Sequence, residues 1–361
     1  MKNIQMILTN GFDPDIRVYK EAKYLVKLGH AVTIHCWDRD GTYIDRIDEC
    51  FEGINIKRYP IISEYGGGAK QFFPFIKFGS QVKKQLQRES TDILYCHDFD
   101  GALVGYFSNI NCKYIIDMHE LFGGYIYSKI PIISKVLFKR ILNKAKAVVY
   151  VNEVQLLKMN DKIKNKSFYI PNYPIKDIYY PIKKSFRKGY DICYVGYVRD
   201  ELSLMTLARI NTIDHIGDIR VHFHGRGELF NNLKKLEDNF SVFVEGSYNG
   251  ITEVGDIYRK TDILYCVYDP KIKNHKVSFP VKLFEAIITE TPIIVCKDTN
   301  AGDFVEKMKI GESVTCGDAT ELSSAIKKII SNYEVYIKNL KKISNDYCWE
   351  AIQEKLSEII K

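Results

Sequence analysis

The sequence lacks the features that mark several large classes of protein. No apolar run approaches the ~20 residues of a membrane-spanning helix. The first fifteen residues contain only a short apolar stretch, soon followed by acidic residues, which is not the form of a secretory signal. The chain also has no low-complexity tract and no short internal repeat. We therefore expect a globular protein with a cytoplasmic location.

The cysteines lack any arrangement that suggests a crosslink or a metal site. The nine cysteines are scattered along the chain and form no CxxC pair. Such an odd, unclustered set favours buried thiols in a reducing cytoplasm over a disulfide framework or a zinc site. Nor does the chain contain a GxGxxG fingerprint or a Walker A sequence, which argues against a nicotinamide-dependent or kinase-like protein.

The excess of positive over negative charge is also small. The 361 residues include 52 Lys and Arg and 45 Asp and Glu, giving a formal net charge of +7. A nucleic-acid-binding protein of this size would be more basic and more clustered in its charge, so we expect no nucleic-acid partner. The whole excess lies in residues 1–180, with 26 basic and 19 acidic residues, and residues 181–361 are neutral. The two halves are therefore expected to differ in their partners.

What is present is an alternation of short apolar runs with helical patterns. Strands are expected at 3–8, 30–36, 92–96, 114–117 and 147–151, and again at 191–195, 220–224, 241–244, 262–267 and 292–296. Helices fill many of the gaps, which is typical of parallel sheets covered on both faces. A stretch rich in Pro, Tyr and Lys separates the two series near 172–188. The sequence thus predicts an α/β protein with two doubly wound domains, whose ligands gather at the carboxyl ends of the strands.

Two loops in the first half place a histidine and carboxylates after an expected strand. His97 and Asp98 follow one strand, and His119 and Glu120 follow the next. A histidine there can donate a hydrogen bond to a sugar hydroxyl or accept a proton near neutral pH. Neighbouring strand residues point apart, so these adjacent pairs are poorly spaced for a metal ion. Helix capping with local hydrogen bonds is the alternative for both loops.

Two glycine-containing turns also follow expected strands. Gly11 lies between the first strand and a helix, where the backbone can approach a ligand and helix amides favour anions. A plain turn with Asp15 as the helix N-cap is the alternative. Gly225 and Gly227 lie in a second strand–turn–helix, which suits a phosphate or another ligand held close to the backbone.

The segment 276–286 combines a helix start with an opposite-charge pair. Ser278 is expected to be the N-cap and Pro280 to lie near the first turn. Lys282 and Glu285 are three residues apart, on one face of that helix. The free amides could hold a phosphate with added charge from Lys282, and Glu285 could reach ribose hydroxyls. A surface ion pair on a capped helix is the alternative.

Taken in order, these loops resemble those of retaining glycosyltransferases of family four. The segments that carry the resemblance are DPDIRVYKEAKYLVKLGHAVTIHC, DILYCHDFDGAL, YIIDMHELFG and SFPVKLFEAIITETPIIV. The resemblance implies the GT-B fold, with two facing Rossmann-like domains and an interdomain cleft. It also implies an acceptor-side domain at 1–175, a nucleotide-sugar-binding domain at 176–345, and a C-terminal helix at 346–361 that returns to the first domain.

The resemblance further implies a role for each loop. His119 and Glu120 would be catalytic, with His119 hydrogen-bonded to the donor sugar, and His97 and Asp98 would lie on the acceptor side. Donor-binding residues would be Gly11, Arg199, Gly225, Gly227, Gly246, Ser247, Ser278, Phe279, Pro280, Val281, Lys282 and Glu285. Among these, Gly225 and Gly227 would border the nucleotide pocket, Gly246 and Ser247 would lie near the base, the amides of Phe279 to Val281 would meet the diphosphate, and Glu285 would bind the ribose.

Two departures from the family pattern stand out. Val277 occupies the position of a frequent glutamate, and the loop 196–202 offers only Arg199 where an arginine and a lysine are usual. Lys282 is a candidate for the missing charge. The expected function is transfer of a sugar from a nucleotide diphosphate sugar to a hydroxyl acceptor with retention, without a metal or cofactor. A non-catalytic partner subunit of a glycosylation complex with the same fold is the alternative.

The segment 66–88 interleaves phenylalanines with basic residues and contains no acidic residue. Basic amphipathic stretches bind anionic membrane surfaces. The resemblance implies a lipid-linked or surface-polysaccharide precursor, such as capsule or O-antigen, as the acceptor. We therefore expect a peripheral position on the inner face of the cell membrane. Packing of the phenylalanines in the core, with solvated lysines, is the alternative.

Overall fold

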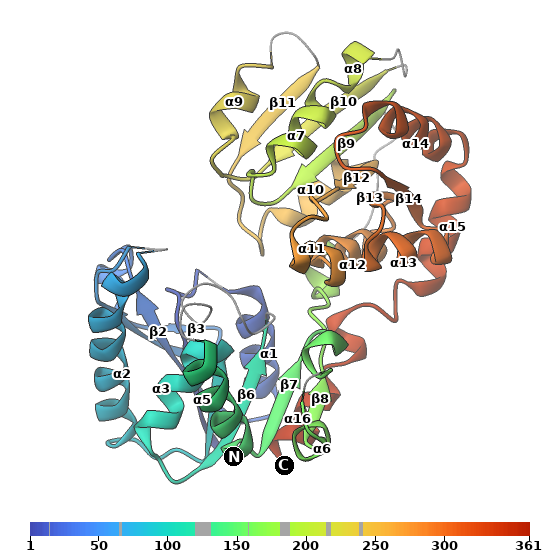
Figure 1. The fold of residues 1–361 in the computed structure, drawn as a ribbon. Coiled ribbons are helices and arrows are strands. Elements are labelled where there is room, and N and C mark those ends of the chain that lie inside the picture. The colour runs from blue at the N-terminus through green and yellow to red at the C-terminus, as the bar shows by residue number, and fades with distance from the viewer. Residues whose placement is uncertain are drawn as a thin grey trace. The chain divides into compact units, whose positions relative to one another are not determined.

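The computed structural model describes residues 1–361 except Pro14 and residues 65–66, 120–130, 158, 181–187, 214–217 and 238–240. The chain forms two compact units (Figure 1). The first unit consists of Met1–Asn172 together with Ile352–Lys361, and the second unit consists of Tyr173–Ala351. Each unit is built on its own sheet, so the α/β class predicted from the sequence is confirmed.

The sheet of the first unit has eight strands in the order β3-β4-β2-β1-β5-β6-β7-β8. All neighbouring pairs are parallel except the β3–β4 hairpin. The strands are β1 (Asn3–Leu8), β2 (Ala31–Asp38), β3 (Asp48–Phe51), β4 (Ile54–Pro60), β5 (Ile93–His97), β6 (Lys113–Met118), β7 (Ala147–Tyr150) and β8 (Ser167–Tyr169). The central strands are buried on both faces, which explains their continuous apolar runs.

Helices cover both faces of this sheet (Figure 1). They are α1 (Ile16–Lys27), α2 (Phe72–Leu86), α3 (Asp98–Ser108), α5 (Pro131–Lys144), α6 (Asp161–Lys164) and the C-terminal α16 (Glu354–Ile360). One apolar cluster joins α2, α3 and α5 to alternate residues of the strands, such as Ile7 and Trp37. Ile4 and Met6 alternate with Ile7 in β1 and so face the opposite side of the sheet.

The sheet of the second unit has six parallel strands in the order β11-β10-β9-β12-β13-β14. They are β9 (Tyr190–Val195), β10 (Ile219–His224), β11 (Val242–Gly246), β12 (Ile263–Cys266), β13 (Ile293–Cys296) and β14 (Gly311–Val314). The helices are α7 (Glu201–Ala208), α8 (Ile210–Ile213), α9 (Phe230–Lys234), α10 (Val254–Lys260), α11 (Lys273–Val277), α12 (Val281–Ile288), α13 (Asn300–Met308), α14 (Ala319–Ser331) and α15 (Tyr333–Ile343).

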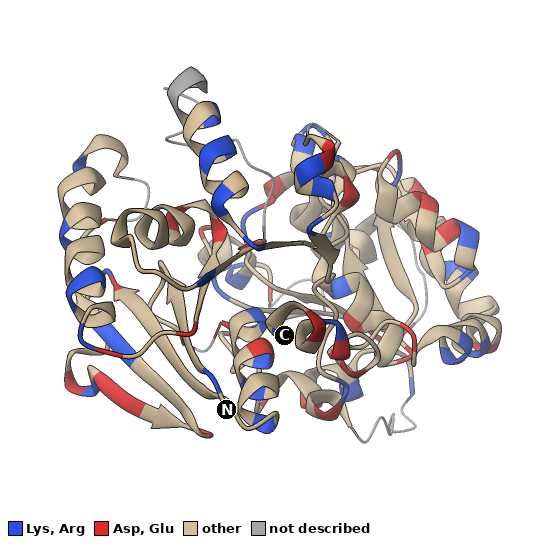
Figure 2. Ribbon diagram, turned by 90° about the horizontal axis from the view of Figure 1, so that it is seen from below, with Lys and Arg blue, Asp and Glu red and all other residues tan. Residues whose placement is uncertain are grey.

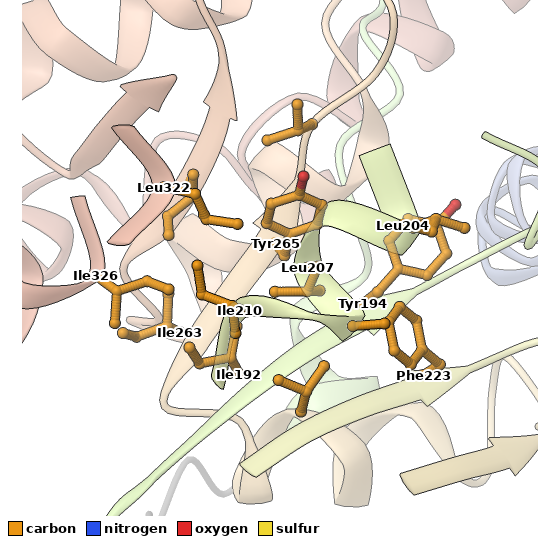
Figure 3. Close-up of a cluster of buried hydrophobic side chains, with 14 of the residues drawn as sticks. Ile192, Tyr194, Leu204, Leu207, Ile210, Phe223, Ile263, Tyr265, Leu322 and Ile326 are labelled. Atoms are coloured by element: carbon orange, nitrogen blue, oxygen red, sulfur yellow. The ribbon is translucent and has the colours of Figure 1, made fainter. Parts of the chain in front are cut away.

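Figure 3 shows the apolar core on one face of this second sheet. Ile192 and Tyr194 of β9 and Phe223 of β10 face side chains of α7 and α14, among them Leu204 and Leu322. The strands turn one set of alternate residues toward this core, and the other set lies against the opposite face. Val242 and Val244 of β11 belong to the same cluster, so β9, β10 and β11 all pack on this core.

The strands expected from the sequence are all present, with ends within two residues of the prediction. The C-terminal helix expected at 346–361 differs, because this segment forms a short 3-10 helix at Trp349–Ala351, followed by α16 at Glu354–Ile360. Within the described residues, every helix is too short or too polar to cross a membrane.

Candidate active site

A group of buried charged side chains lies at the carboxyl ends of β5 and β6 in the first unit. Asp117, in β6, is fully buried, and Arg17, in the first turn of α1, places its guanidinium against it. Nε of Arg17 donates to Oδ2 of Asp117 at 2.8 Å, and Nη2 donates to Oδ1 at 2.6 Å. Burial by itself would raise the pKa of Asp117, but Arg17 and His119 hold it well below its usual value. Asp117 is therefore ionised, and the planar guanidinium of Arg17 binds both of its oxygens. We call these two hydrogen bonds the fork.

His119, the residue after β6, contacts two carboxylates. Its Nε2 lies 2.8 Å from Oδ2 of Asp117, and its Nδ1 lies 3.4 Å from Oδ2 of Asp98. Burial would lower the pKa of His119, but Asp98 and Asp117 more than offset that effect and raise it to about 9. The ring is therefore charged at neutral pH, and both of its nitrogens are hydrogen-bond donors.

Asp98 is the exposed member of this group. Its side chain is 42% exposed, its Oδ1 accepts a hydrogen bond from the backbone amide of His119 at 2.9 Å, and its φ is 55°. A non-glycine residue in this left-handed region is uncommon and is often found at functional sites. The Nδ1 of His119 thus meets a solvent-accessible carboxylate across a long contact, which a ligand hydroxyl could replace.

His97, the last residue of β5, lies beneath His119. Its Nδ1 is 3.1 Å from Nε2 of His119 and 3.3 Å from Oδ2 of Asp117, and only 1% of the residue is exposed. We call Arg17, His97, Asp98, Asp117 and His119 the Asp117 cluster. His97 contacts other members of the cluster from within the core, and its acceptor-side role stays a prediction, as does that of Asp98.

Three potential metal ligands meet in the Asp117 cluster. One atom each of His97, Asp117 and His119 lies within 4.8 Å of the others. Sequence reasoning tested only adjacent pairs and missed this set, which comes from two neighbouring strands. Both oxygens of Asp117 already accept hydrogen bonds from Arg17, and a cation bound here would lie against that guanidinium. The donor set fits an internally neutralised carboxylate better than a metal site.

Gly11 is fixed by its neighbours in the first unit. Its carbonyl accepts a hydrogen bond from Nε of Arg58 at 3.0 Å, and a Cβ at this position would lie 2.8 Å from the ring of Tyr43. The helix that follows is capped by Asp15, whose carboxylate accepts from the amides of Arg17 and Val18. Local packing thus explains the glycine and the cap, and a role for Gly11 toward a donor stays a prediction. Glu120 lies outside the described residues.

In the second unit, α12 carries a compact polar network. Oε2 of Glu285 accepts from Nζ of Lys282 at 2.8 Å and from the hydroxyl of Tyr258 at 2.6 Å. Nζ of Lys282 also lies 3.5 Å from the hydroxyl of Tyr248. Glu285 is 6% exposed. Burial would lower the pKa of Lys282, but Glu285 and Tyr248 raise it, so the lysine is charged. This pair is partly buried, which rejects the alternative of a plain surface ion pair.

The start of α12 differs from the prediction at Ser278. Ser278 follows α11, and its hydroxyl donates to the carbonyl of Asn274, so it is not the N-cap of α12. Pro280 occupies the cap position, with no side-chain hydrogen bond to the helix, and it has no amide hydrogen to offer. Phe279 and Val281 remain as backbone donors of the predicted set. First-turn amides have no partner within their own helix, which leaves them suited to an anion.

Gly225 and Gly227 serve the packing of two loops. The amide of Gly196 donates to His224, and the amide of Val198 donates to Arg226, so the loops after β9 and β10 run side by side. With φ values of 142° and 157°, a Cβ on Gly225 or Gly227 would collide with the backbone of Gly196 or Val198. The glycines therefore permit the close approach, and their border on a nucleotide pocket stays a prediction.

The remaining predicted residues lie on loops at the same end of this sheet. Arg199 is exposed, with its guanidinium 6.0 Å from the ring centre of Tyr197. Gly246 ends β11 with a φ of 81°, and its carbonyl accepts from Gly225 at 2.6 Å. Ser247 follows it and is exposed. These positions agree with the rule that ligands bind at the carboxyl ends of parallel strands.

The sequence analysis missed Arg17 and Asp117 in the first unit and Tyr248 and Tyr258 in the second. A signal existed for Asp117, because an aspartate inside the apolar run of a central strand needs a buried partner. Arg17 could not be paired with it from the sequence, since 100 residues separate them. The tyrosines carry no signal of their own in a chain with 25 of them.

A comparison with protein-family models gives a match that lies within the first unit. Residues 16–172 match the family model described as Glycosyltransferase Family 4. No curated protein matches the chain significantly in sequence.

Solved structures are similar over the whole chain. Sucrose-phosphate synthase from Thermosynechococcus elongatus has a TM-score of 0.76 at 16% identity, covering 100% of this chain and 98% of that one. A glycosyltransferase from Rickettsia africae has a TM-score of 0.70 at 17% identity, covering 100% and 99%. Anabaena HepE in complex with UDP-glucose has a TM-score of 0.71 at 12% identity, covering 100% and 99%. At these identities the likeness shows a shared fold.

Proposed function

Because residues 16–172 belong to Glycosyltransferase Family 4 and the chain has the GT-B fold, we propose that this protein is a retaining glycosyltransferase. It moves a sugar from a nucleotide diphosphate sugar to a hydroxyl acceptor. The observation that carries the proposal is His119, held charged at the carboxyl end of β6 with Nδ1 against an exposed carboxylate. A hydroxyl of the donor sugar takes the place of Asp98 and accepts the hydrogen bond from Nδ1.

The second unit supplies the donor site in this proposal. Lys282 and the first amides of α12 meet the diphosphate, and Arg199 adds a second positive charge. When the phosphate draws Lys282 away, Glu285 keeps the hydrogen bond from Tyr258 and accepts hydrogen bonds from the ribose hydroxyls. The HepE structure contains UDP-glucose, which makes uridine donors the first to test.

The proposed reaction needs no metal or cofactor. The bond between the anomeric carbon and the diphosphate oxygen breaks, and the acceptor oxygen bonds to the same face of that carbon. The acceptor hydroxyl gives its proton to the departing diphosphate oxygen. The developing negative charge is stabilised by Lys282, Arg199 and helix amides already in place, which is the largest usual source of catalysis for such a leaving group.

A donor screen tests the proposal. The purified chain is heated with UDP-, GDP-, ADP- and dTDP-sugars, and unfolding temperature and donor hydrolysis are both measured. We expect one donor class to raise the unfolding temperature and to be slowly hydrolysed. Stabilisation without turnover, even with acceptor extracts, would favour the non-catalytic partner. No response to any donor would overturn the proposed donor site.

We further propose that α2 binds an anionic membrane surface, which places the protein at the inner face of the cell membrane. Phe78, Val82 and Leu86 of α2 are buried in the core, but Phe72, Phe73 and Ile76 are 61%, 78% and 50% exposed. The basic residues of the described segment 67–88, among the blue positions in Figure 2, are Lys70, Lys77, Lys83, Lys84 and Arg88. Apolar insertion and attraction to anionic lipid act together in such a helix. A lipid-linked or surface-polysaccharide precursor fits this position as acceptor.

Vesicle sedimentation tests this surface. The wild-type chain is expected to sediment with vesicles containing phosphatidylglycerol and to remain in solution with phosphatidylcholine alone. The changes Phe72→Ser and Phe73→Ser together, or Lys77→Glu with Lys84→Glu, should each reduce binding at least tenfold. Lys338→Glu with Lys342→Glu in α15 is the matched control, because these lysines are equally exposed on a basic helix of the second unit. Binding that ignores anionic lipid would contradict the proposal.

A further inference from the structure

We propose that Arg17 is a positioning residue of the transfer reaction: its fork on Asp117 keeps Oδ2 against Nε2 of His119, so that Nδ1 is the ring nitrogen offered to the donor sugar. This inference rests on the function proposed above and deepens it. Arg17 itself does not reach a substrate, because its side chain is 3% exposed. It acts through Asp117, which is fully buried, on His119, which is 15% exposed.

The guanidinium of Arg17 has partners on three sides, and these contacts fix its orientation relative to the carboxylate of Asp117. Nη1 donates to the carbonyl of Ile170 at 3.1 Å, and Nη2 lies 3.3 Å from Oε1 of Glu21, one turn further along α1. Nε and the same Nη2 donate to the two oxygens of Asp117. A lysine could supply the same charge, but it could not hold both oxygens in one plane.

Asp117 needs such a grip because two histidines compete for it. Nδ1 of His97 lies 3.3 Å from the same Oδ2 that accepts from His119, and the two histidine nitrogens are 3.1 Å apart. A carboxylate free to turn could pair with His97 instead. His119 would then lose the partner that fixes its ring and its charge. The fork therefore determines which histidine Asp117 serves.

The charged and titratable surroundings of His119 agree with this assignment. Among the described residues they are Asp15, Arg17 and Glu21 at α1, His97 on β5, Asp98 on α3 and Asp117 on β6. Lys20 and Tyr95 interact with Asp117. Of the carboxylates in the described part of the chain, Asp98 and Asp117 are the two that contact its ring. Asp98 is exposed and can yield to a sugar, so Asp117 is the partner that must stay in place.

The test compares Arg17→Lys with Arg58→Lys. Arg58 is a matched control, since it is equally buried in the first unit and binds Glu49 and the carbonyl of Gly11. Nitrogen-15 NMR of the imidazoles reports the protonation and hydrogen bonding of His119, and it needs no turnover. For Arg17→Lys we expect loss of the Asp117-bonded Nε2 signal and a fall in kcat of at least tenfold, with nucleotide affinity changed less than twofold. Arg58→Lys should leave all three unchanged.

Asp117→Asn gives a second route if Arg17→Lys does not fold. Without the carboxylate, the His119 titration and the basic limb of kcat should both move down by more than one pH unit. An unchanged His119 signal in Arg17→Lys, an unchanged titration in Asp117→Asn, or an equal effect in Arg58→Lys would overturn the proposal. If no donor is turned over by any variant, the NMR result still decides the role of Arg17, and the proposed function alone has failed.

Discussion

In the proposed donor site, Lys282 is the side chain that can supply positive charge where the second unit has few other candidates. Position 277, where the resemblance leads one to expect a glutamate, is Val277, and the loop 196–202 after β9 contains Arg199 as its one basic residue. Lys282 provides a partly buried, charged amine on the first turn of α12, positioned by Glu285 and by the hydroxyl of Tyr248. Because an ammonium beside a diphosphate forms charge-assisted hydrogen bonds, this one side chain could supply much of the missing attraction.

The change Lys282→Gln should weaken nucleotide binding strongly. A hydrogen bond to a charged group contributes about 1.5–3 kcal/mol, which corresponds to roughly 10- to 150-fold in affinity. Titration calorimetry with the best donor of the screen measures the effect. Lys297→Gln is the control, because it removes a similar 2.8 Å ion pair, with Glu321, from the same unit. Equal affinities for the two variants would remove Lys282 from the donor site.

His119 should affect turnover more than nucleotide binding. Its proposed partner is the transferred sugar, and the nucleotide is assigned to the second unit, so His119→Ala should lower kcat by about 10²-fold or more with little change in affinity for the free nucleotide. The pKa of about 9 also sets a direction: activity should fall as pH rises through about 9, where the ring loses its charge. Near-normal turnover of His119→Ala would contradict the role given to His119.

At the scale of the element, α1 links the Asp117 cluster to the last residues of the first unit's main segment. Arg17 binds the carbonyl of Ile170, and Nζ of Lys20 donates to Oδ1 of Asn172 at 2.7 Å. Lys20 is 1% exposed. Burial first, and the charge of Arg17 second, lower the pKa of Lys20 to about 7. The packed face of α1 therefore contains two buried basic residues, Arg17 and Lys20, beside its apolar residues.

The pKa of Lys20 predicts a pH-dependent stability. Between pH 7 and about 10.5 the unfolded chain holds a proton on Lys20 that the folded chain lacks, so the free energy of unfolding gains from rising pH. The difference between wild type and Lys20→Met should therefore rise with pH, by up to about 1.4 kcal/mol per unit between pH 7.5 and 10. Urea unfolding at several pH values measures it, and groups shared by both chains cancel. Lys23→Met, at a half-exposed lysine of the same helix, should show no such rise.

The elements also show what the sequence could and could not predict. The buried strands were predicted because a continuous apolar run is a local signal that can be read directly from the sequence. The prediction that Ser278 is the N-cap of α12 was wrong, because its hydroxyl donates to the carbonyl of Asn274 in α11. The sequence located the two histidine loops, but it did not predict the hydrogen bonds and charge of their side chains. These depend on the Arg17–Asp117 pair, whose members are 100 residues apart and meet only in the folded chain.

At the scale of the whole molecule, the chain crosses between its units twice. The first unit is completed by Ile352–Lys361, after the second unit has been built. Leu356, Ile359 and Ile360 are almost fully buried, and the amines of Lys2 and Lys113 donate to the carbonyls of Ile360 and Ile359, each at 2.6 Å. The last ten residues are therefore packed as a part of the first unit. Two of the basic residues in the first half of the sequence, Lys2 and Lys113, bind them.

This assignment predicts which unit a C-terminal change destabilises. Leu356→Ala removes a fully buried side chain of α16 and should cost the first unit about 2–5 kcal/mol. Leu340→Ala, at an equally buried leucine of α15, is its counterpart in the second unit. In calorimetry, the two variants should each lower a different unfolding transition, and a bound nucleotide should raise only the transition that Leu340→Ala lowers. If Leu356→Ala instead lowered the nucleotide-sensitive transition, the last ten residues would belong energetically to the second unit.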